Sequence, residues 1–193
     1  QVADYLRQQN IPLCTFKDQV VFEKDEVLKP DGTPYTVFTP YSKMWKARYV
    51  QHPPQIYNCS EYFNRFYQTN PIAIPSLESI GFKPCILDIP SPEPNAGIIR
   101  KYDENRNIPG VEGTSKLSVH LRFGTVSVRL LAQKAFQWNE QWLNELIWRE
   151  FFMQVMYHFP YVVHKSFKSG YDGIPWINDE SAFEKWCAGE TGY

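Results

Sequence analysis

Residues 1–30 show the pattern of a helix followed by short strands. Apolar residues at positions 2, 3 and 6, followed by Asn10, predict the end of an amphipathic helix over residues 2–10. Two runs that alternate apolar and polar residues, 11–16 and 19–22, predict short strands. Because a helix followed by a strand is typical of an α/β unit, we expect residues 1–30 to be the end of an α/β domain.

The next part of the chain is rich in turn-forming residues. The run Pro30–Pro34 predicts a turn, since proline presets one backbone dihedral angle and glycine accepts a positive one. Residues 35–38 predict a strand or an extended segment. From residue 51 to residue 95, prolines and aromatic residues recur without a helical period. We therefore interpret residues 31–95 as a linker between two domains.

The second half of the chain has helical character. Residues 115–131, 139–159 and 181–188 have the apolar spacing of helices, and short loops with glycine and proline separate them. Residues 96–193 are therefore expected to form part of a helical domain. Taken together, the patterns predict a mixed α/β and α fold.

The helix predicted over 139–159 has two distinct faces. The first face carries Leu143, Leu146, Ile147, Glu150 and Val155. The second face carries Trp142, Glu145, Trp148 and Phe152. One interpretation is a helix buried on two sides, with Glu145 paired to Arg149 one turn later. The other is an aromatic platform with one carboxylate, which suits the stacking of a base or a planar cofactor.

Small hydroxyl residues precede the helix predicted from residue 115. The segment Gly113–Ser118 would place hydroxyls and free backbone N–H groups where they suit a phosphate. The structural alternative is simple N-capping of the helix by Thr114 or Ser115.

Composition and charge narrow the class of protein. The chain has 193 residues, 43% of them hydrophobic, and a net charge of −1, so it can form a core but has no overall positive charge to attract nucleic acid. Its four cysteines are far apart and its four histidines lack metal-ligand spacing, so we expect neither a disulfide framework nor a metal site. No stretch approaches the ~20 apolar residues of a membrane helix. We expect a cytoplasmic protein, and we interpret the chain, which begins without methionine, as a fragment.

Four motifs occur here in the same order as in the photolyase/cryptochrome family. They are Tyr35–Trp45, Tyr102 with Glu112–Ser118 and His120–Gly124, Trp142–Phe152, and Trp186 with Gly189–Tyr193. Over nearly the whole chain the sequence resembles class I DNA photolyases, and only residues 55–95 match loosely.

The resemblance implies a carbon–carbon lyase that splits cyclobutane pyrimidine dimers in DNA by light-driven electron transfer from reduced FAD. It implies a DNA-contacting helix over Glu145–Phe152, in which Trp148 stacks on the flipped dimer and Glu145 accepts a hydrogen bond from it. Glutamate rather than glutamine at position 145 resembles the cyclobutane-dimer enzymes rather than the six-four enzymes. The residues implied to contact DNA are Arg106, Glu145, Trp148, Arg149 and Phe152.

The resemblance also implies the residues that bind FAD. They are Tyr102, Thr114, Ser115, Lys116, Leu117, Ser118 and Trp142. Trp176 resembles the surface member of the tryptophan relay that reduces the flavin, with an ordinary loop tryptophan as the alternative. The second, antenna chromophore is unknown; Val163 precedes His164 where folate-using members carry lysine, so a folate antenna is not supported.

Two other functions are alternatives to a repair enzyme. A cryptochrome-type photoreceptor would keep the flavin without repairing DNA, and a helical interaction domain would have no chemistry. Glu145 and Trp148 favour the repair enzyme, because a receptor needs no indole that stacks on a dimer. The family implies a monomer that acts on UV-damaged DNA, and since much of the pocket would lie outside this chain, we expect the fragment alone to bind FAD weakly and to be inactive.

Overall fold

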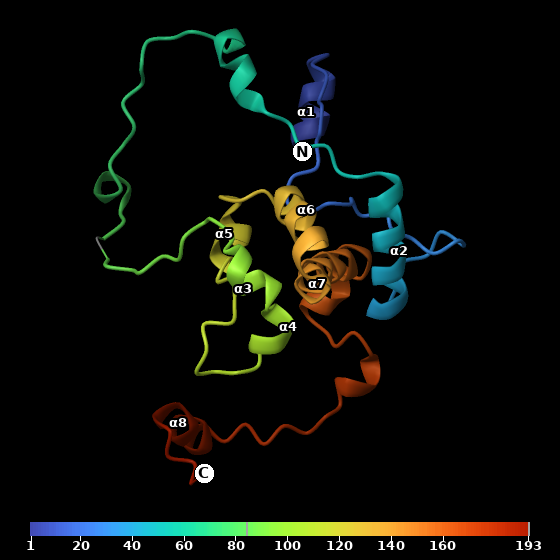
Figure 1. Cartoon of the computed structure of the whole chain (residues 1–193), viewed down its shortest axis with the longest axis vertical. Coiled ribbons are helices and arrows are strands. Elements are labelled where there is room, and N and C mark those ends of the chain that lie inside the picture. Colours follow the sequence, from blue (N-terminus) through green and yellow to red (C-terminus); the bar gives the residue numbers. More distant parts are fainter. Residues whose placement is uncertain (84, 193) are drawn as a thin grey trace.

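The computed structural model describes residues 1–83 and 85–192, which are helical or irregular (Figure 1). These residues form no β-strand, apart from an isolated antiparallel bridge between Leu28 and Pro34. The α-helices are α1 (Val2–Gln8), α2 (Phe38–Gln51), α3 (Ala96–Arg100), α4 (Tyr102–Asn105), α5 (Ser118–Phe123), α6 (Val128–Trp138), α7 (Glu140–His158) and α8 (Glu180–Ala188). The short 3-10 helices are η1 (Cys59–Arg65), η2 (Glu78–Ile80), η3 (Pro160–Val163) and η4 (Ser169–Tyr171).

Helix α7 lies at the centre of the fold, where α2, α4 and α6 pack against it (Figure 1). Asn139 caps its first turn, because the side-chain Oδ1 accepts a hydrogen bond from Trp142 N at 3.0 Å. The core that forms around it contains Val21, Phe22, Val27, Tyr35, Tyr41, Trp45, Tyr49, Ile99, Leu117, Val128, Leu131, Ala132, Ala135, Trp142, Leu143, Leu146, Ile147 and Phe151. The N-terminal segment, α2, α6 and α7 therefore share one core.

The two faces of α7 differ in burial. Its buried residues are Trp142, Leu143, Leu146, Ile147, Glu150, Phe151 and Gln154. A stripe that the core leaves partly or fully uncovered carries Gln141, Glu145, Trp148, Arg149 and Phe152. The apolar face predicted from the sequence is thus confirmed. Trp142 was predicted on the second face, but it is buried and exposes only 4% of its surface.

The helical character predicted over 115–131 is confirmed, but the structure has two helices there, α5 and α6, and not one continuous helix. Helix α5 ends at Gly124, which adopts φ 68°, a left-handed conformation that glycine reaches without steric cost. Helix α6 begins after Ser127, whose hydroxyl accepts a hydrogen bond from Leu130 N at 3.4 Å. It then continues to Trp138, beyond the predicted end.

Helix α2 was not predicted, since its residues fell in the proposed linker over 31–95. It forms because Tyr41, Trp45 and Tyr49 are spaced four residues apart, and all three are buried against the core. The turn at residues 30–34 is confirmed, with Gly32 at φ 78° and a hydrogen bond from Gly32 N to Lys29 O at 2.9 Å. The division into three domains stays a prediction.

The connection after α2 has the irregular character that the sequence predicted. Between residues 52 and 95 the described residues form only η1 and η2, and they extend away from the core (Figure 1). Beyond α7, residues 160–192 also extend from the core and lead to α8. The helix predicted over 181–188 is confirmed there; Asp179 caps it, and it buries none of its residues.

The strands predicted over 11–16 and 19–22 are wrong. No neighbouring strand pairs with either segment in the described chain, and side chains of α7 hold the N-terminal backbone instead. Arg149 Nη1 donates to Gln19 O at 2.7 Å, and Gln154 Nε2 donates to Lys24 O at 3.0 Å and to Val27 O at 2.9 Å. The described residues are therefore helical or irregular, and the α/β part of the predicted fold finds no support in them.

Glu150 joins three separate parts of this fold. Its carboxylate accepts hydrogen bonds from Val21 N at 2.6 Å, from Phe22 N at 3.1 Å and from Trp45 Nε1 at 2.7 Å. Only 3% of its surface is exposed. Burial raises the pKa of Glu150 to about 7, although the three donors favour the ionised form.

This pKa gives the first testable prediction, which concerns stability. Because Glu150 binds its proton more tightly in the folded state, its contribution to stability is complete below the unfolded pKa near 4.5 and is lost as the pH rises through about 7. We expect the free energy of unfolding to fall over this range by up to a few kcal/mol. Denaturant titrations from pH 4.5 to pH 8 test this, with Glu150→Gln as the variant that lacks the titrating group. Equal pH slopes for the two proteins would contradict it.

Candidate functional site

The uncovered stripe of α7 holds an aromatic stack. The rings of Trp148 and Phe38 lie face to face, with centroids 3.6 Å apart and planes 6° from parallel. The ring of Phe152 lies 5.4 Å from Trp148 at 24° and is 57% exposed. Phe38 is the first residue of α2, so this stack joins the start of α2 to the middle of α7. The predicted platform therefore includes one ring that the sequence analysis did not assign.

One turn before Trp148, a carboxylate is fixed in the same stripe. Arg106 Nη1 forms an ion pair with Glu145 Oε1, and Gln141 Nε2 donates to the same oxygen at 3.2 Å. The Arg106 guanidinium also lies 5.6 Å from the centre of the Tyr102 ring. Hydrogen bonding to Tyr102 and the charge of Glu145 raise the pKa of Arg106 above its ordinary value, so the guanidinium is charged.

The alternative in which Glu145 pairs with Arg149 is wrong. Arg149 turns toward the core, where it donates to Gln19 O at 2.7 Å and to Leu121 O at 3.5 Å. Burial lowers the pKa of its guanidinium. Arg149 thus has a structural contact that the sequence did not predict, and its contact with DNA stays a prediction.

The hydroxyl segment lies beside the first turns of α7. The buried indole of Trp142 donates from Nε1 to Ser115 Oγ at 3.4 Å. Thr114, Lys116 and Ser118 are exposed, whereas Leu117 is buried in the core. Capping of α5 by Thr114 or Ser115 is wrong, because its N-cap is Leu117 and no side-chain capping bond forms.

A tight turn leads into this hydroxyl segment. An added Cβ at Gly113 would lie 2.5 Å from the backbone oxygen of Asn105 in α4, so only glycine fits between the loop and that helix. Lys116 adopts φ 53° and forms an ion pair with Glu112 at 2.6 Å. These contacts fix the path of the loop relative to α4 and α7.

Predicted cofactor and DNA residues therefore meet around the first half of α7. Exposed hydroxyls at Thr114 and Ser118 can donate to phosphate oxygens, and the Trp142 indole lies beside them through Ser115. This donor set suits a nucleotide cofactor. Tyr102 and Arg106 precede these hydroxyls along the chain, and both are half-buried.

Trp176 is not brought to this group of residues. It follows η4 on the segment that leads to α8, and 72% of its surface is exposed. Exposure is compatible with the outer end of an electron path, and its role in electron transfer stays a prediction.

Two residues of the site escaped the sequence analysis. Phe38 belongs to the motif Tyr35–Trp45, and its contact with Trp148 spans 110 positions, so no local pattern could reveal it. Gln141 could have been found, because it precedes Glu145 by one helical turn and Gln–carboxylate contacts at this spacing are common.

The described residues were also compared with the requirements of a metal site and of a membrane-spanning helix. Within residues 1–83 and 85–192, no group of three or more His, Cys, Asp or Glu side chains could hold a metal ion. In the same ranges, none of the helices combines the length and the apolar character needed to cross a membrane. Cys14, Cys59, Cys85 and Cys187 are free and exposed.

Comparison with known proteins finds two matching family models. Residues 142–193 match the FAD binding domain of DNA photolyase, and residues 1–58 match the DNA photolyase model. Two deoxyribodipyrimidine photo-lyases cover nearly all of this chain. The protein from Alkalihalophilus pseudofirmus is 32% identical over 98% of this chain and 43% of its own length, and that from Synechococcus sp. is 30% identical over 100% and 46%. The chain thus spans less than half the length of these relatives.

A solved structure shares the fold. The crystal structure of a bacterial class III photolyase from Agrobacterium tumefaciens matches with a TM-score of 0.73 and 23% sequence identity. The match covers 100% of this chain and 44% of that one.

The close approach at Gly113 gives a prediction for the hydroxyl loop. Gly113→Ala should lower the free energy of unfolding by about 1–3 kcal/mol, because its Cβ would press on the Asn105 backbone, which cannot rotate away. Gly110→Ala in the same loop is the matched control, since no described atom lies within 4 Å of its added Cβ. Thermal unfolding compares the two, and equal midpoints would contradict the assigned loop geometry.

Proposed function

The chain belongs to the DNA photolyase family, and from this premise we propose that the protein is a deoxyribodipyrimidine photolyase of the class I, cyclobutane-dimer type. In this proposal the substrate is UV-damaged DNA and the cofactor is FAD, which when bound and reduced supplies the electron that splits the dimer. The observation that carries the proposal is the uncovered stripe of α7, where a fixed carboxylate lies one turn from a stacked indole.

Trp148 is the residue that we propose stacks on the flipped lesion. Removing a damaged pair from the duplex costs a few kcal/mol, and stacking on an aromatic ring returns about 1–3 kcal/mol per base. Phe152 extends the aromatic surface toward solvent. The pair can thus offset the cost of flipping a dimer, which already pairs poorly within DNA.

Glu145 is the proposed hydrogen-bond acceptor for the lesion. Arg106 and Gln141 both donate to Oε1, which holds the carboxylate in one orientation. The second oxygen, Oε2, can then accept an N–H of a flipped pyrimidine. Arg106 keeps further N–H groups for a DNA phosphate, and a guanidinium–phosphate contact is strong because both partners are charged.

The residues proposed to hold FAD are those of the hydroxyl loop, with Tyr102 and Trp142. Thr114, Ser115 and Ser118 would donate to its phosphates, and Trp142 would border the flavin. Lys116 and Leu117 would contribute through their backbone, since Leu117 is in the core. These residues form one wall, and a pocket normally encloses most of its ligand, so we expect this chain alone to hold FAD weakly.

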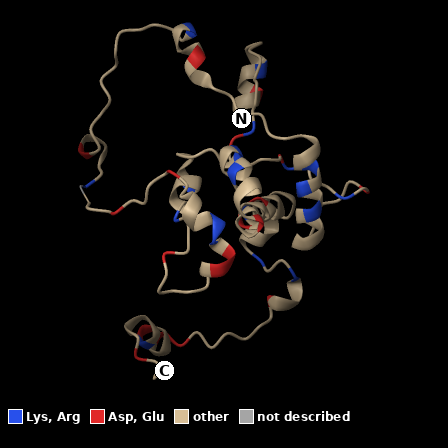
Figure 2. Ribbon diagram, viewed as in Figure 1, with Lys and Arg blue, Asp and Glu red and all other residues tan. Residues whose placement is uncertain are grey.

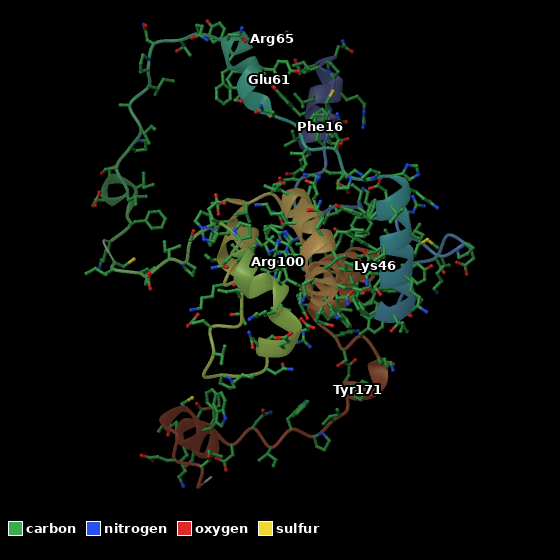
Figure 3. The ribbon with its side chains drawn as sticks, viewed as in Figure 1. Phe16, Lys46, Glu61, Arg65, Arg100 and Tyr171 are labelled. Atoms are coloured by element: carbon green, nitrogen blue, oxygen red, sulfur yellow. The ribbon has the colours of Figure 1, made fainter. Side chains whose placement is uncertain are left out.

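Positive charge for the DNA backbone would come from local groups. Lys43, Lys46 and Arg48 lie on α2, whose ribbon shows several basic residues in Figure 2 and on which Figure 3 labels Lys46. Lys46 pairs with Glu140 of α7 at 2.6 Å. Arg100 lies at the end of α3, near the start of α4 (Figure 3). Each phosphate that such groups neutralise would add roughly 0.9 to the slope of log K against log salt. We further propose that the protein is a monomer, as the family resemblance implies, and that it is cytoplasmic, where its exposed cysteines would stay reduced.

The lesion contact gives a prediction for DNA binding. Trp148→Ala should lower affinity for duplex DNA that carries a thymine dimer about tenfold or more, because one stacking contact is lost, and should leave affinity for undamaged duplex unchanged. Fluorescence anisotropy titrations measure both affinities. Trp186→Ala is the matched control, since Trp186 is an exposed tryptophan of α8 away from the stripe. Wild-type protein that fails to discriminate the lesion would favour a cryptochrome-type receptor over a repair enzyme.

The cofactor wall gives a separate prediction. The double variant Thr114→Val/Ser118→Ala should bind FAD at least about tenfold more weakly than wild type, because two donors to charged phosphate oxygens are removed. Flavin fluorescence titration gives the dissociation constants. Thr69→Val, an exposed hydroxyl of the long connection, is the control, and equal affinities would remove these hydroxyls from the cofactor site.

A further inference from the structure

The motif Tyr35–Trp45 has no role in the chemistry assigned so far. Within it, Tyr41 and Trp45 are buried in the core, which explains their presence through packing. Phe38 differs from them, because it is only half-buried at the edge of the core and its ring lies face to face on Trp148.

Phe38 and Phe151 together restrict the Trp148 ring on two sides. Phe38 covers one face of the indole at 3.6 Å, and the buried ring of Phe151 meets the indole at 75° with centroids 5.6 Å apart. Phe38 and Phe151 also contact each other, with centroids 5.9 Å apart at 73°. Three rings that touch pairwise leave the indole little freedom to change its rotamer.

The position of Phe38 is itself determined by the core. It begins α2, and α2 is anchored one and two turns later through Tyr41 and through Trp45, whose indole donates to Glu150 at 2.7 Å. The ring of Phe38 therefore belongs to a docked helix and not to a mobile loop end. A rigid support of this kind can hold a surface indole in place before any ligand arrives.

We infer that Phe38 is a positioning residue for lesion recognition, which holds the Trp148 indole so that the part of the ring left uncovered can stack on a flipped pyrimidine. This inference rests on the proposed function and adds a residue to it. An indole that is already fixed loses little rotamer freedom when it binds. A large side chain that is free before binding lowers the affinity by a factor of about 2–10 when it becomes ordered.

The test compares two substitutions of Phe38. Phe38→Leu keeps an apolar side chain but removes the ring, and should weaken binding to dimer-containing duplex about 3–10-fold, with undamaged duplex unaffected. Phe38→Tyr keeps the ring and should restore wild-type affinity. Phe136→Leu is the matched control, since Phe136 is another surface phenylalanine that stacks on an aromatic ring, that of Tyr49 at 5.2 Å.

A double-mutant cycle separates positioning from general packing. In the Trp148→Ala background, Phe38→Leu should produce no further loss of lesion affinity, because its effect acts through the indole. Additive losses, or wild-type affinity for Phe38→Leu, would overturn the inference while the proposed function stands. Absence of lesion discrimination in the wild-type protein would instead overturn the proposed function.

A readout without DNA tests the stack directly. The fluorescence of Trp148 is obtained by subtracting the emission spectrum of Trp148→Phe from that of the wild-type protein. In Phe38→Leu this signal should become more accessible to acrylamide quenching, whereas Phe136→Leu should leave it unchanged. Unchanged quenching in Phe38→Leu would show that Phe38 does not cover the indole.

Discussion

The carboxylate of Glu150 is the contact on which the arrangement of this protein depends. A buried carboxylate is costly unless donors surround it, and here two backbone N–H groups and one indole N–H do so. The donors come from positions 21, 22 and 45, while Glu150 belongs to α7. A single side chain thus fixes the N-terminal segment and α2 against the central helix.

The same helix holds the N-terminal backbone by further polar side chains. Arg149 contacts the backbone oxygen of Gln19. Gln154 contacts those of Lys24 and Val27, and His158 also contacts that of Lys24. These bonds satisfy carbonyl groups that a sheet would otherwise pair. This explains how residues 19–27 can pack on a helical core without forming a strand.

Helix α7 therefore divides its residues between structure and function by face. The buried face supplies the core and the polar anchors, and the uncovered stripe presents Glu145, Trp148 and Phe152. Docking of α2 through Trp45 also carries Phe38 onto the indole of Trp148. The core and the proposed lesion site are consequently linked, because the contact that buries Glu150 also determines which ring supports the exposed stripe.

Local patterns were sufficient for the helices with strong periodicity and for the irregular connection. The helix over 139–159, the helix near the C-terminus and the turn at 30–34 follow from spacing, capping residues and turn chemistry, which act within a few residues. Helix α2 was not predicted, because the four-residue spacing of Tyr41, Trp45 and Tyr49 lies in a region rich in proline and other aromatic residues, which indicates an irregular chain. The alternating pattern of residues 11–16 and 19–22 predicts strands, but such a pattern carries no information about a pairing partner, and the described chain offers neither segment one.

In the site, too, some features follow from local sequence spacing and others from contacts between distant parts of the chain. The sequence by itself determined the chemical types on the stripe of α7, since residues three and four apart on a helix share a face. Only the tertiary structure decided that Glu145 pairs with Arg106, that Arg149 turns to the N-terminal backbone and that Phe38 stacks on Trp148. These partners lie 39, 130 and 110 positions apart, and such contacts depend on how whole helices dock rather than on any local spacing.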